Sequence, residues 1–254
     1  MYEKQNNILI IKNIKKAFDD SLIIDNISMN VRASEFVSIL GLSGSGKSTI
    51  LNIVSGLSSP DSGSITYDNI EITGVTGKLG YMPQKDLLLP WKTIIDNVCI
   101  PLIIKGFAKV AAASKAIEYF ELFGLSGYEK KHPHELSGGM RQRAALLRTF
   151  LFSGNLMLLD EPFGSLDAIT KTKMQDWLAT TQKELHTSIL FVTHDIDEAI
   201  FLSDRIYVIS DKPSVINGEF SIDIQRDSNR NSIASEKFLS LKNKIYKSLI
   251  VRNV

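Results

Sequence analysis

The sequence has 254 residues, of which 44% are hydrophobic and 22% are charged, and its formal net charge is +1. A chain of this length can bury a sizeable core in one large or two small domains. Its 29 basic residues are scattered among 28 acidic ones, which argues against a protein held to nucleic acid by a basic face. The single cysteine, Cys99, cannot form an intrachain disulfide, so we expect the protein to work in a reducing compartment. We expect Cys99 itself to be a small buried hydrophobic residue.

The N-terminal part of the chain predicts short strands. Residues 8–14, 28–31 and 65–67 are rich in β-branched and apolar side chains, and residues 60–63, PDSG, predict a turn. The apolar run at residues 8–11 is too brief for a signal-peptide core, and no later run nears the ~20 residues of a membrane span. We therefore expect a mixed β region and a chain without a secretion signal or a membrane segment.

A phosphate-binding loop is the most specific local motif. Residues 41–48, GLSGSGKS, match G-x-x-x-x-G-K-[ST] and stand between an apolar run at 36–40 and a helix-like stretch at 49–54. The glycines allow successive N–H groups to converge on phosphate oxygens, and the helix N-terminus adds partial positive charge. We expect Lys47 to reach the β- and γ-phosphates and Ser48 to ligate Mg²⁺. A purely structural turn would need neither residue.

The rest of the chain alternates predicted strands and helices. Short β-rich runs at residues 79–82, 156–160, 188–193 and 205–209 join the run at 36–40, and because helical stretches separate them, a parallel sheet is expected. Residues 85–128 have helical character with a stop at Gly124. Three short motifs follow, LSGGM at 136–140 ahead of a helical stretch at 141–151, SLD at 165–167 and THD at 193–195.

These motifs occur in the order and at the spacing found in the nucleotide-binding subunit of ATP-binding cassette (ABC) transporters, which the chain resembles from about Ile8 to Ile209. The resemblance implies an α/β fold, a P-loop NTPase cassette with a mainly parallel core sheet, an N-terminal antiparallel β region and a helical subdomain. We expect the cassette over residues 1–225, with the helical subdomain inserted at about 85–150. A basic amphipathic tail is expected over residues 226–254.

The resemblance also implies catalytic roles that suit the chemistry of each residue. Asp160 ends a predicted strand and suits Mg²⁺, which favours oxygen ligands, whereas Glu161 is free to polarise the attacking water. His194 is expected to contact the γ-phosphate, and Gln84 to present its amide to the metal and the water. Because phosphoryl transfer depends on positioning and charge stabilisation, these four groups with Lys47 suffice.

The LSGGM motif is expected to act across a dimer. In the family, two cassettes pack head to tail, and each ATP lies between the P-loop of one chain and the signature loop of the other. Ser137 would belong to that second loop and would also cap the helix that follows. Asp167 is expected at the dimer interface, with helix capping as the alternative, and Phe18 is expected to stack on adenine, with a core position as the alternative.

The predicted site is therefore large. Its nucleotide-binding residues are Phe18, Gly41, Ser43, Gly44, Ser45, Gly46, Lys47, Ser48, Thr49, Ser137, Gly138, Gly139 and Asp167. Its predicted Mg²⁺ ligands are Ser48, Gln84 and Asp160, and its predicted catalytic residues are Lys47, Gln84, Glu161 and His194.

Two regions are expected at the surface. Residues 86–91, DLLLPW, are unusually apolar for a loop and match the position where the family's membrane subunits dock, so we place the permease near Leu87, Leu88 and Trp91. The alternative is a buried loop that covers the subdomain. The tail carries apolar residues at helical spacing among lysines and an arginine, Arg252, which is typical of a helix packed on its own domain or, alternatively, of one on a membrane surface.

The segments DLLLPW and LSGGMRQR resemble the importer subgroup for nitrate, sulfonates and taurine, which also includes importers of pyrimidine precursors of thiamine. Met140 replaces the glutamine common in the family and is familiar in one importer subgroup. The resemblance implies an ATP- and Mg²⁺-dependent motor at the cytoplasmic face of the membrane, which forms a homodimer and serves separate permease subunits and an extracytoplasmic solute-binding protein.

Two other classes remain open. A non-transport ABC-type ATPase would carry two cassettes or a long coiled-coil insertion, and this chain has neither. A regulatory cassette would bind ATP without hydrolysing it, and the presence of Glu161 and His194 argues against that class.

Overall fold

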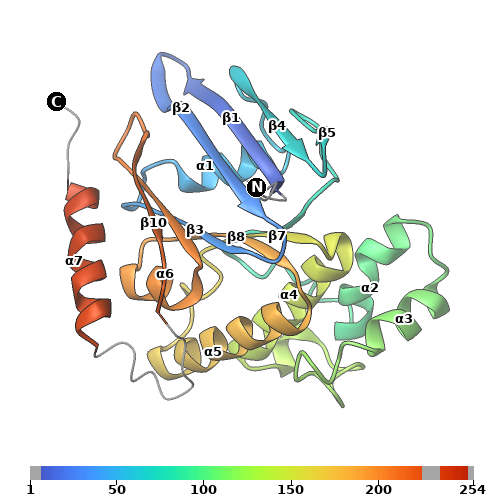
Figure 1. The fold of residues 1–254 in the computed structure, drawn as a ribbon. Helices are drawn as coiled ribbons and strands as arrows, with labels where there is room; N and C mark the ends of the chain where they lie inside the picture. The colour runs from blue at the N-terminus through green and yellow to red at the C-terminus, as the bar shows by residue number, and fades with distance from the viewer. Residues whose placement is uncertain (1–6, 225–234, 251–254) are drawn as a thin grey trace, which may run out of the picture.

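An antiparallel sheet forms the N-terminal part of the protein (Figure 1). The structure, a computed structural model, describes residues 7–224 and 235–250. The sheet has the order β2-β1-β4-β5, with β1 at Asn7–Phe18, β2 at Ser21–Arg32, β4 at Ser62–Tyr67 and β5 at Ile70–Glu71. All three neighbouring pairs are antiparallel, so the antiparallel β region is confirmed. The turn predicted at 60–63 is shorter than expected, because β4 already begins at Ser62.

A second, mainly parallel sheet lies at the centre of the fold. Its order is β10-β9-β3-β8-β7-β6, with β3 at Phe36–Leu40, β6 at Gly80–Met82, β7 at Leu156–Asp160, β8 at Ser188–Thr193, β9 at Arg205–Ile209 and β10 at Ile216–Ser221. The pairs from β9 to β6 are parallel, and β10 is antiparallel to β9. Every residue of β3, β7, β8 and β9 is buried, as expected of parallel strands covered on both faces.

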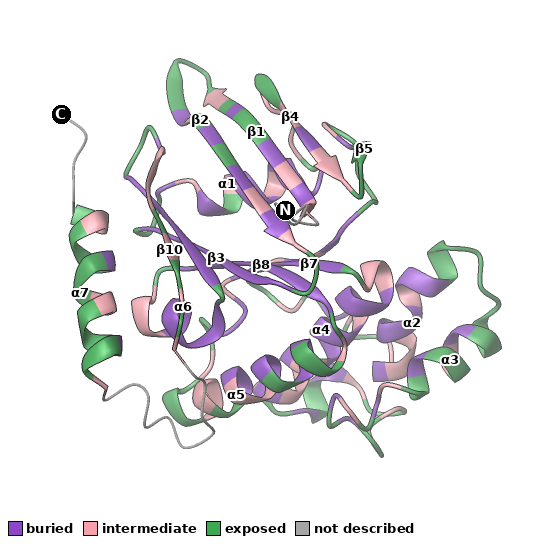
Figure 2. Ribbon diagram, in the orientation of Figure 1, coloured by how far each residue is buried: buried purple, intermediate pink, exposed green. Residues whose placement is uncertain are grey.

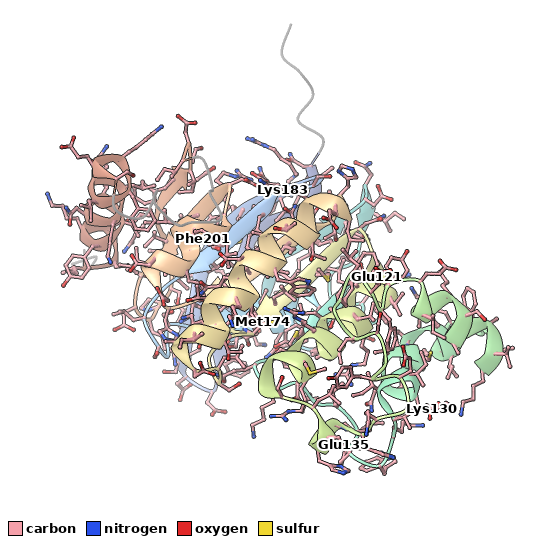
Figure 3. All side chains as sticks on the ribbon, turned by 90° about the horizontal axis from the view of Figure 1, so that it is seen from below. Glu121, Lys130, Glu135, Met174, Lys183 and Phe201 are labelled. Atoms are coloured by element: carbon pink, nitrogen blue, oxygen red, sulfur yellow. The ribbon has the colours of Figure 1, made fainter. Side chains whose placement is uncertain are left out.

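Helices flank this sheet and form a separate lobe (Figure 1). They are α1 at Lys47–Val54, α2 at Ile94–Ile104, α3 at Lys109–Ile117, the 3₁₀ helix η1 at Pro133–Glu135, α4 at Gly138–Ser153, α5 at Ala168–Glu184, α6 at Ile196–Leu202 and α7 at Glu236–Ile250. Helices α2 and α3 lie at the lobe end of the molecule. In Figure 3, α5 runs between Phe201 on the α6 side and the lobe segment that contains Glu121, Lys130 and Glu135.

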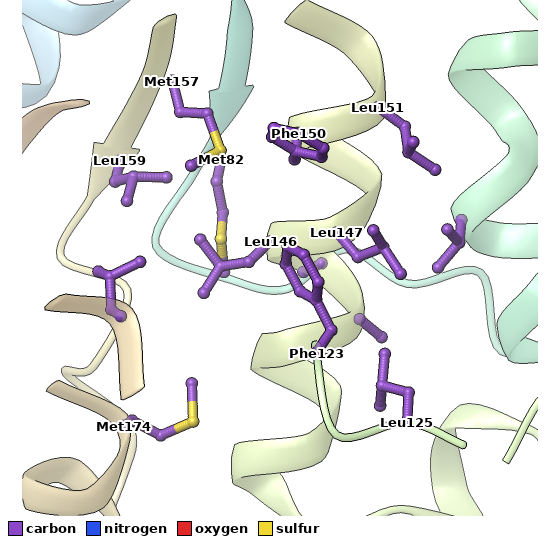
Figure 4. Packing of buried hydrophobic residues seen from close by; sticks show 14 of the residues in the cluster. Met82, Phe123, Leu125, Leu146, Leu147, Phe150, Leu151, Met157, Leu159 and Met174 are labelled. Carbon is purple, nitrogen blue, oxygen red and sulfur yellow. The ribbon is translucent and has the colours of Figure 1, made fainter. Parts of the chain in front are cut away.

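The core lies on both faces of the parallel sheet, because successive strand residues point to opposite sides. On one face, Phe36, Met157 and Phe191 join side chains from α2, α4 and α5. On the other face, Val37 and Leu158 join α1 and the antiparallel sheet. Figure 4 shows the first face, where methionines from β6 and β7 lie next to leucine and phenylalanine side chains of α4. Figure 2 shows that burial is concentrated in these central strands and the helices beside them.

Cys99 belongs to the first of these cores, which confirms the prediction of a buried hydrophobe. Burial raises the pKa of its thiol to about 11. The thiol is therefore protonated at neutral pH and poorly reactive.

Helix α7 packs on its own domain, as predicted. Phe238 and Ile245 are buried against Ala199 and Ile200 of α6, and Lys242 Nζ lies 2.7 Å from Asp197 Oδ1. Figures 1 and 2 show α7 on the outer side of the molecule, with its exposed face turned away from α6. The boundary expected at residue 225, and Arg252, lie outside the described residues. No helix within the described ranges is long and apolar enough to cross a membrane.

Candidate nucleotide site

The phosphate-binding loop joins the buried strand β3 to helix α1, as its sequence predicts. Gly44 and Gly46 have φ values of 85° and 93°, a region that glycine enters without steric cost, so the loop can fold back over the start of α1. Lys47 is the first residue of α1, and its Nζ donates to the carbonyl oxygens of Gly41 at 2.9 Å and Leu42 at 2.8 Å. The lysine therefore lies within the curve of its own loop.

Not every residue of the loop faces outward. A Cβ atom on Gly41 would come within 2.7 Å of Ile209, and the Ser45 side chain is fully buried. The Ser45 N–H also donates within the loop, to the carbonyl oxygen of Leu42 at 3.2 Å. Gly41 and Ser45 thus hold the loop against β9 and do not line the open side.

Two carboxylates follow strand β7 at the same edge of the sheet. Asp160 is buried, receives a hydrogen bond from the Ser48 hydroxyl, and lies 3.4 Å from the Tyr81 hydroxyl. Burial raises the pKa of Asp160, and the nearby Glu161 adds to the effect. Burial is also the main cause of the lowered pKa of Lys47, which both carboxylates partly oppose. A cation bound here would relieve the cost of burying Asp160.

Glu161 adopts a rare backbone conformation. Its φ is 43°, which costs a non-glycine residue on the order of 1–3 kcal/mol and is found most often at functional sites. The turn directs its Oε1 to 3.8 Å from Lys47 Nζ and 3.0 Å from His194 Nδ1. The carboxylate is 17% exposed and the imidazole 52%, so both can reach a ligand in the open pocket.

The phosphate-binding loop and the two carboxylates line one polar pocket of about 420 Å³, here called the phosphate pocket. The phosphate-binding loop contributes Ser43, Gly44, Gly46, Lys47, Ser48 and Thr49, and other segments contribute Gln84, Asp160, Glu161 and Lys212. The pocket therefore unites the three predicted Mg²⁺ ligands, a hydroxyl, an amide and a carboxylate, which are the oxygen donors that Mg²⁺ prefers. Lys212 was missed by sequence reasoning, because nothing in the surrounding SDKPS segment suggests a phosphate site.

Other predicted site residues lie outside the phosphate pocket. The described residues that line it do not include Phe18, Ser137, Gly138, Gly139 or Asp167, and Gly41, Ser45 and His194 are not among them either. His194 adjoins the pocket through its contact with Glu161. The Phe18 ring is about half exposed, and the ammonium of Lys16 lies 5.3 Å from its centroid. Phe18 is thus a surface residue, which excludes the alternative of a core position.

The signature loop is built as a helix start. Ser137 caps α4 by accepting a hydrogen bond from the N–H of Met140 at 3.3 Å. Asp167 caps α5 by accepting from the N–H groups of Ile169 at 3.1 Å and Thr170 at 3.0 Å. Both predicted capping roles are confirmed. Ser137 and Asp167 are exposed, whereas Gly138 is partly buried and Gly139 is buried.

A charged network supports the segment that carries His194, and sequence reasoning did not detect it. Lys171 in the first turn of α5 donates to Asp195 Oδ2 at 2.8 Å. The buried Glu198 accepts hydrogen bonds from the Thr193 hydroxyl and from the side-chain amide of Gln175. Asp195 is therefore fixed directly to α5, the helix that Asp167 caps, and Thr193 is fixed to it through Glu198 of α6.

The apolar loop at residues 86–91 divides into buried and exposed parts. Trp91 is 72% exposed and Leu87 is 57% exposed, but Leu88 is only 7% exposed and belongs to the core. The prediction that Leu88 lies at a docking surface is therefore wrong, because its side chain fills the core below the loop. The Asn97 side chain accepts from Leu89 N–H at 2.7 Å, and Arg148 donates to the Asp86 and Leu87 carbonyls at 2.6 and 2.8 Å, so the loop is firmly held.

An apolar cleft of about 280 Å³ lies near this loop. It is lined by Leu57, Tyr81, Ile104 and Phe152 among others, and Arg148 forms part of its wall. Tyr81 also lies close to Asp160 in the phosphate pocket. Tyr81 of β6 therefore connects the cleft to one side chain of the phosphate pocket.

Comparison with known proteins gives consistent results. A family model described as ABC transporter matches residues 24–164. The formylaminopyrimidine import ATP-binding protein ThiZ of Halalkalibacterium halodurans is 42% identical over 243 residues, covering 95% of this chain and 94% of that protein. The nitrate import ATP-binding protein NrtD of Synechocystis sp. is 40% identical over 80% of this chain and 77% of its own length. The dimeric, post-hydrolysis structure of the ATP-binding cassette MJ0796, bound to ADP and Pi, has a TM-score of 0.71 at 31% identity and covers 84% of this chain and 98% of that one.

Proposed function

The chain belongs to the ABC transporter family and is an ATPase, and from this premise we propose that it is the ATP-hydrolysing subunit of an importer for a small solute. The observation that carries this proposal is the phosphate pocket, in which Lys47, Asp160 and Glu161 converge and His194 contacts Glu161. A cassette that only bound ATP would not need Glu161 and His194. The regulatory alternative is therefore less well supported.

The roles of the residues follow from their positions. Lys47 and the loop N–H groups bind the phosphates, and Ser48, Gln84 and Asp160 hold Mg²⁺, which supplies charge neutralisation at the phosphates when bound. Glu161 accepts a proton from the attacking water or orients it, and His194, held through Nδ1 by Glu161, presents its other ring nitrogen to the γ-phosphate. Phe18, exposed beside Lys16, is the proposed stacking partner of adenine.

The complete site requires a second copy of the chain. Ser137, Gly138, Gly139 and Asp167 lie outside the pocket of their own chain, and the exposed Ser137 at the start of α4 is free to meet the γ-phosphate bound by the other copy. The ATP sandwich is supported by the dimeric relative bound to ADP and Pi. Each dimer would then contain two composite sites.

The partner that completes transport is a separate permease, which we place at the cytoplasmic face of the membrane together with this subunit. The exposed Trp91 and Leu87 and the adjacent apolar cleft are the proposed docking surface. Gln84 lines the phosphate pocket only a few residues before Leu87, so a change at the phosphates can reach the docked subunit. An extracytoplasmic solute-binding protein would deliver the solute to the permease.

The solute class is proposed from the relatives. Their names refer to formylaminopyrimidine, nitrate and aliphatic sulfonates, so the candidates are pyrimidine precursors, nitrate and sulfonates including taurine. Cells that depend on this chain should lose uptake of one labelled candidate when Lys47 is replaced by Ala, at an unchanged level of the protein. Undiminished uptake of every candidate in the Lys47→Ala cells would reject the importer proposal.

A further inference from the structure

The turn between β9 and β10, residues 210–215, is held against the phosphate-binding loop. The Ser214 hydroxyl donates to the carbonyl oxygen of Ser45, and a Cβ atom on Gly46 would lie 3.3 Å from Ser214 Oγ. Figure 1 shows the orange hairpin that leads into β10 rising beside β2. The turn and the loop are thus neighbours, although some 170 residues separate them in sequence.

The turn is rigidly built. The Ser214 N–H donates to the Ile23 carbonyl at 2.8 Å, and the Asp25 N–H donates to the Ser214 carbonyl at 2.9 Å, so β2 holds the turn from one side. The Ser210 hydroxyl closes the turn itself, because it accepts from the Val215 N–H at 3.0 Å and donates to the Asp211 carbonyl at 2.8 Å. A side chain on this turn therefore has a defined position relative to the phosphate-binding loop.

Lys212 extends from this turn and lines the phosphate pocket. Lys47, the other lysine of the pocket, donates to two loop carbonyls and lies near Glu161, so part of its charge is already compensated. Lys212 is exposed and forms no ion pair with any carboxylate in residues 7–224 or 235–250. Its ammonium is thus available to an anion in the pocket.

We propose that Lys212 is a second phosphate-binding lysine, which contacts the phosphate chain of the nucleotide from the side of the pocket formed by the 210–215 turn. It is a binding residue and takes no part in the proton transfers at Glu161. The inference rests on the proposed nucleotide site and adds a contact outside the family motifs that predicted that site. A point charge at the rim attracts a ligand in proportion to the charge that the ligand carries, so the contribution of Lys212 should increase from adenosine to ADP to ATP.

The test is the affinity of the full-length chain for ATP, ADP and adenosine, measured by isothermal titration calorimetry at low salt. Lys212→Ala should weaken ATP binding by about tenfold, ADP binding less, and adenosine binding not at all. Lys212→Arg should restore most of the loss. Lys183→Ala, on an exposed lysine at the far end of α5 (Figure 3), is the matched control and should change nothing. The KM for ATP should rise in Lys212→Ala while kcat stays within about twofold.

The outcomes are distinguishable. Lys47→Ala measures the proposed site itself, and if that change does not weaken ATP binding, both the site and this inference fail. If Lys47→Ala weakens binding but Lys212→Ala does not, only the inference fails. An equal loss for adenosine and ATP, or a lowered melting temperature in Lys212→Ala, would mean that the lysine stabilises the turn and does not bind phosphate.

Discussion

The Nδ1 atom of His194 lies 3.0 Å from Oε1 of Glu161, and the same carboxylate oxygen lies 3.8 Å from Nζ of Lys47. One carboxylate thus connects the histidine that follows β8 to the lysine at the start of α1. The contact orients the imidazole, because an Nδ1–H directed at a carboxylate leaves Nε2 as the nitrogen available to a ligand. The strained turn at Glu161 is the structural feature that allows both contacts.

Removal of the imidazole should therefore affect hydrolysis more than binding. His194→Ala is expected to lower kcat by roughly 10²–10⁴-fold, the usual range for a side chain that acts on a proton or charge in the transition state. ATP affinity should change little, since Lys47 and the loop N–H groups remain. A steady-state ATPase assay paired with equilibrium ATP binding checks this, and a variant that hydrolyses normally would remove His194 from the site.

If each ATP site is formed by two copies of the chain, two inactive variants should complement each other. Lys47→Ala should lose phosphate binding, and Ser137→Arg should lose the signature contact, which Ser137 makes from an exposed helix cap. A heterodimer of the two contains one site in which both halves are intact. Part of the ATPase activity should return on mixing, up to about half of the activity per dimer if the sites act independently.

The heterodimer must first be demonstrated, for example with two different affinity tags. Each variant alone, taken through the same mixing steps, is the control. Mixtures that stay inactive although heterodimers form would show that the sites are not shared or that both must act together.

Leu88 and Trp91 should respond in opposite ways although they are three residues apart. Leu88→Ala removes a buried side chain from the core and should lower the free energy of unfolding by about 2–5 kcal/mol. Trp91→Ser changes an exposed side chain and should leave melting temperature and basal ATPase nearly intact while weakening capture by the permease. Calorimetry, ATPase and pull-down on the two variants test this pair, and a large loss of stability in Trp91→Ser would reject the docking role.

The buried Asp160 should destabilise the protein at neutral pH when nucleotide and metal are absent. Burial raises its pKa in the folded state, so the folded state binds the proton more tightly, and stability falls as pH rises through that raised pKa. Asp160→Asn cannot ionise and should therefore melt at a higher temperature than the parent at pH 7. The difference should shrink as pH falls through the raised pKa and be smallest at about pH 4, near the unfolded pKa of an aspartate.

Calorimetric scans of both chains between pH 4 and 8 measure this difference. The Asp160→Asn variant should also lose Mg²⁺-dependent ATP hydrolysis. It would then be more stable than the parent chain but inactive. An Asn variant that is less stable than the parent at pH 7 would mean that the hydrogen bonds of Asp160 with Ser48 and Tyr81 outweigh its desolvation.

Much of this fold could be predicted from local patterns. The five parallel strands are short apolar runs between helices, and the phosphate-binding loop has fixed spacing between strand and helix, so periodicity and motif were sufficient. Ser137 and Asp167 were also predictable as caps, because a capping side chain contacts residues only two or three positions away. Such features depend on near neighbours in the sequence.

The errors and omissions involve distant contacts. Leu87 and Leu88 are both leucines, yet Leu88 is buried and Leu87 is exposed. The direction of each side chain depends on how Asn97 and Arg148 hold the loop. Lys212 reaches the phosphate pocket only because β9 lies beside β3, and Lys171 supports the His194 segment only because α5 packs near α6. Sequence spacing contains no information on these pairings.

ATP turnover by Glu161→Gln, measured together with ATP binding, decides whether Glu161 activates the attacking water, because the substitution removes one charge and retains the shape of the side chain. The variant should bind ATP and elute as an ATP-bound dimer in size-exclusion chromatography. It should hydrolyse ATP at least ~10³-fold more slowly, a loss of about 4 kcal/mol of transition-state stabilisation. Hydrolysis at the rate of the parent chain would contradict the assignment of Glu161 as the residue that activates water.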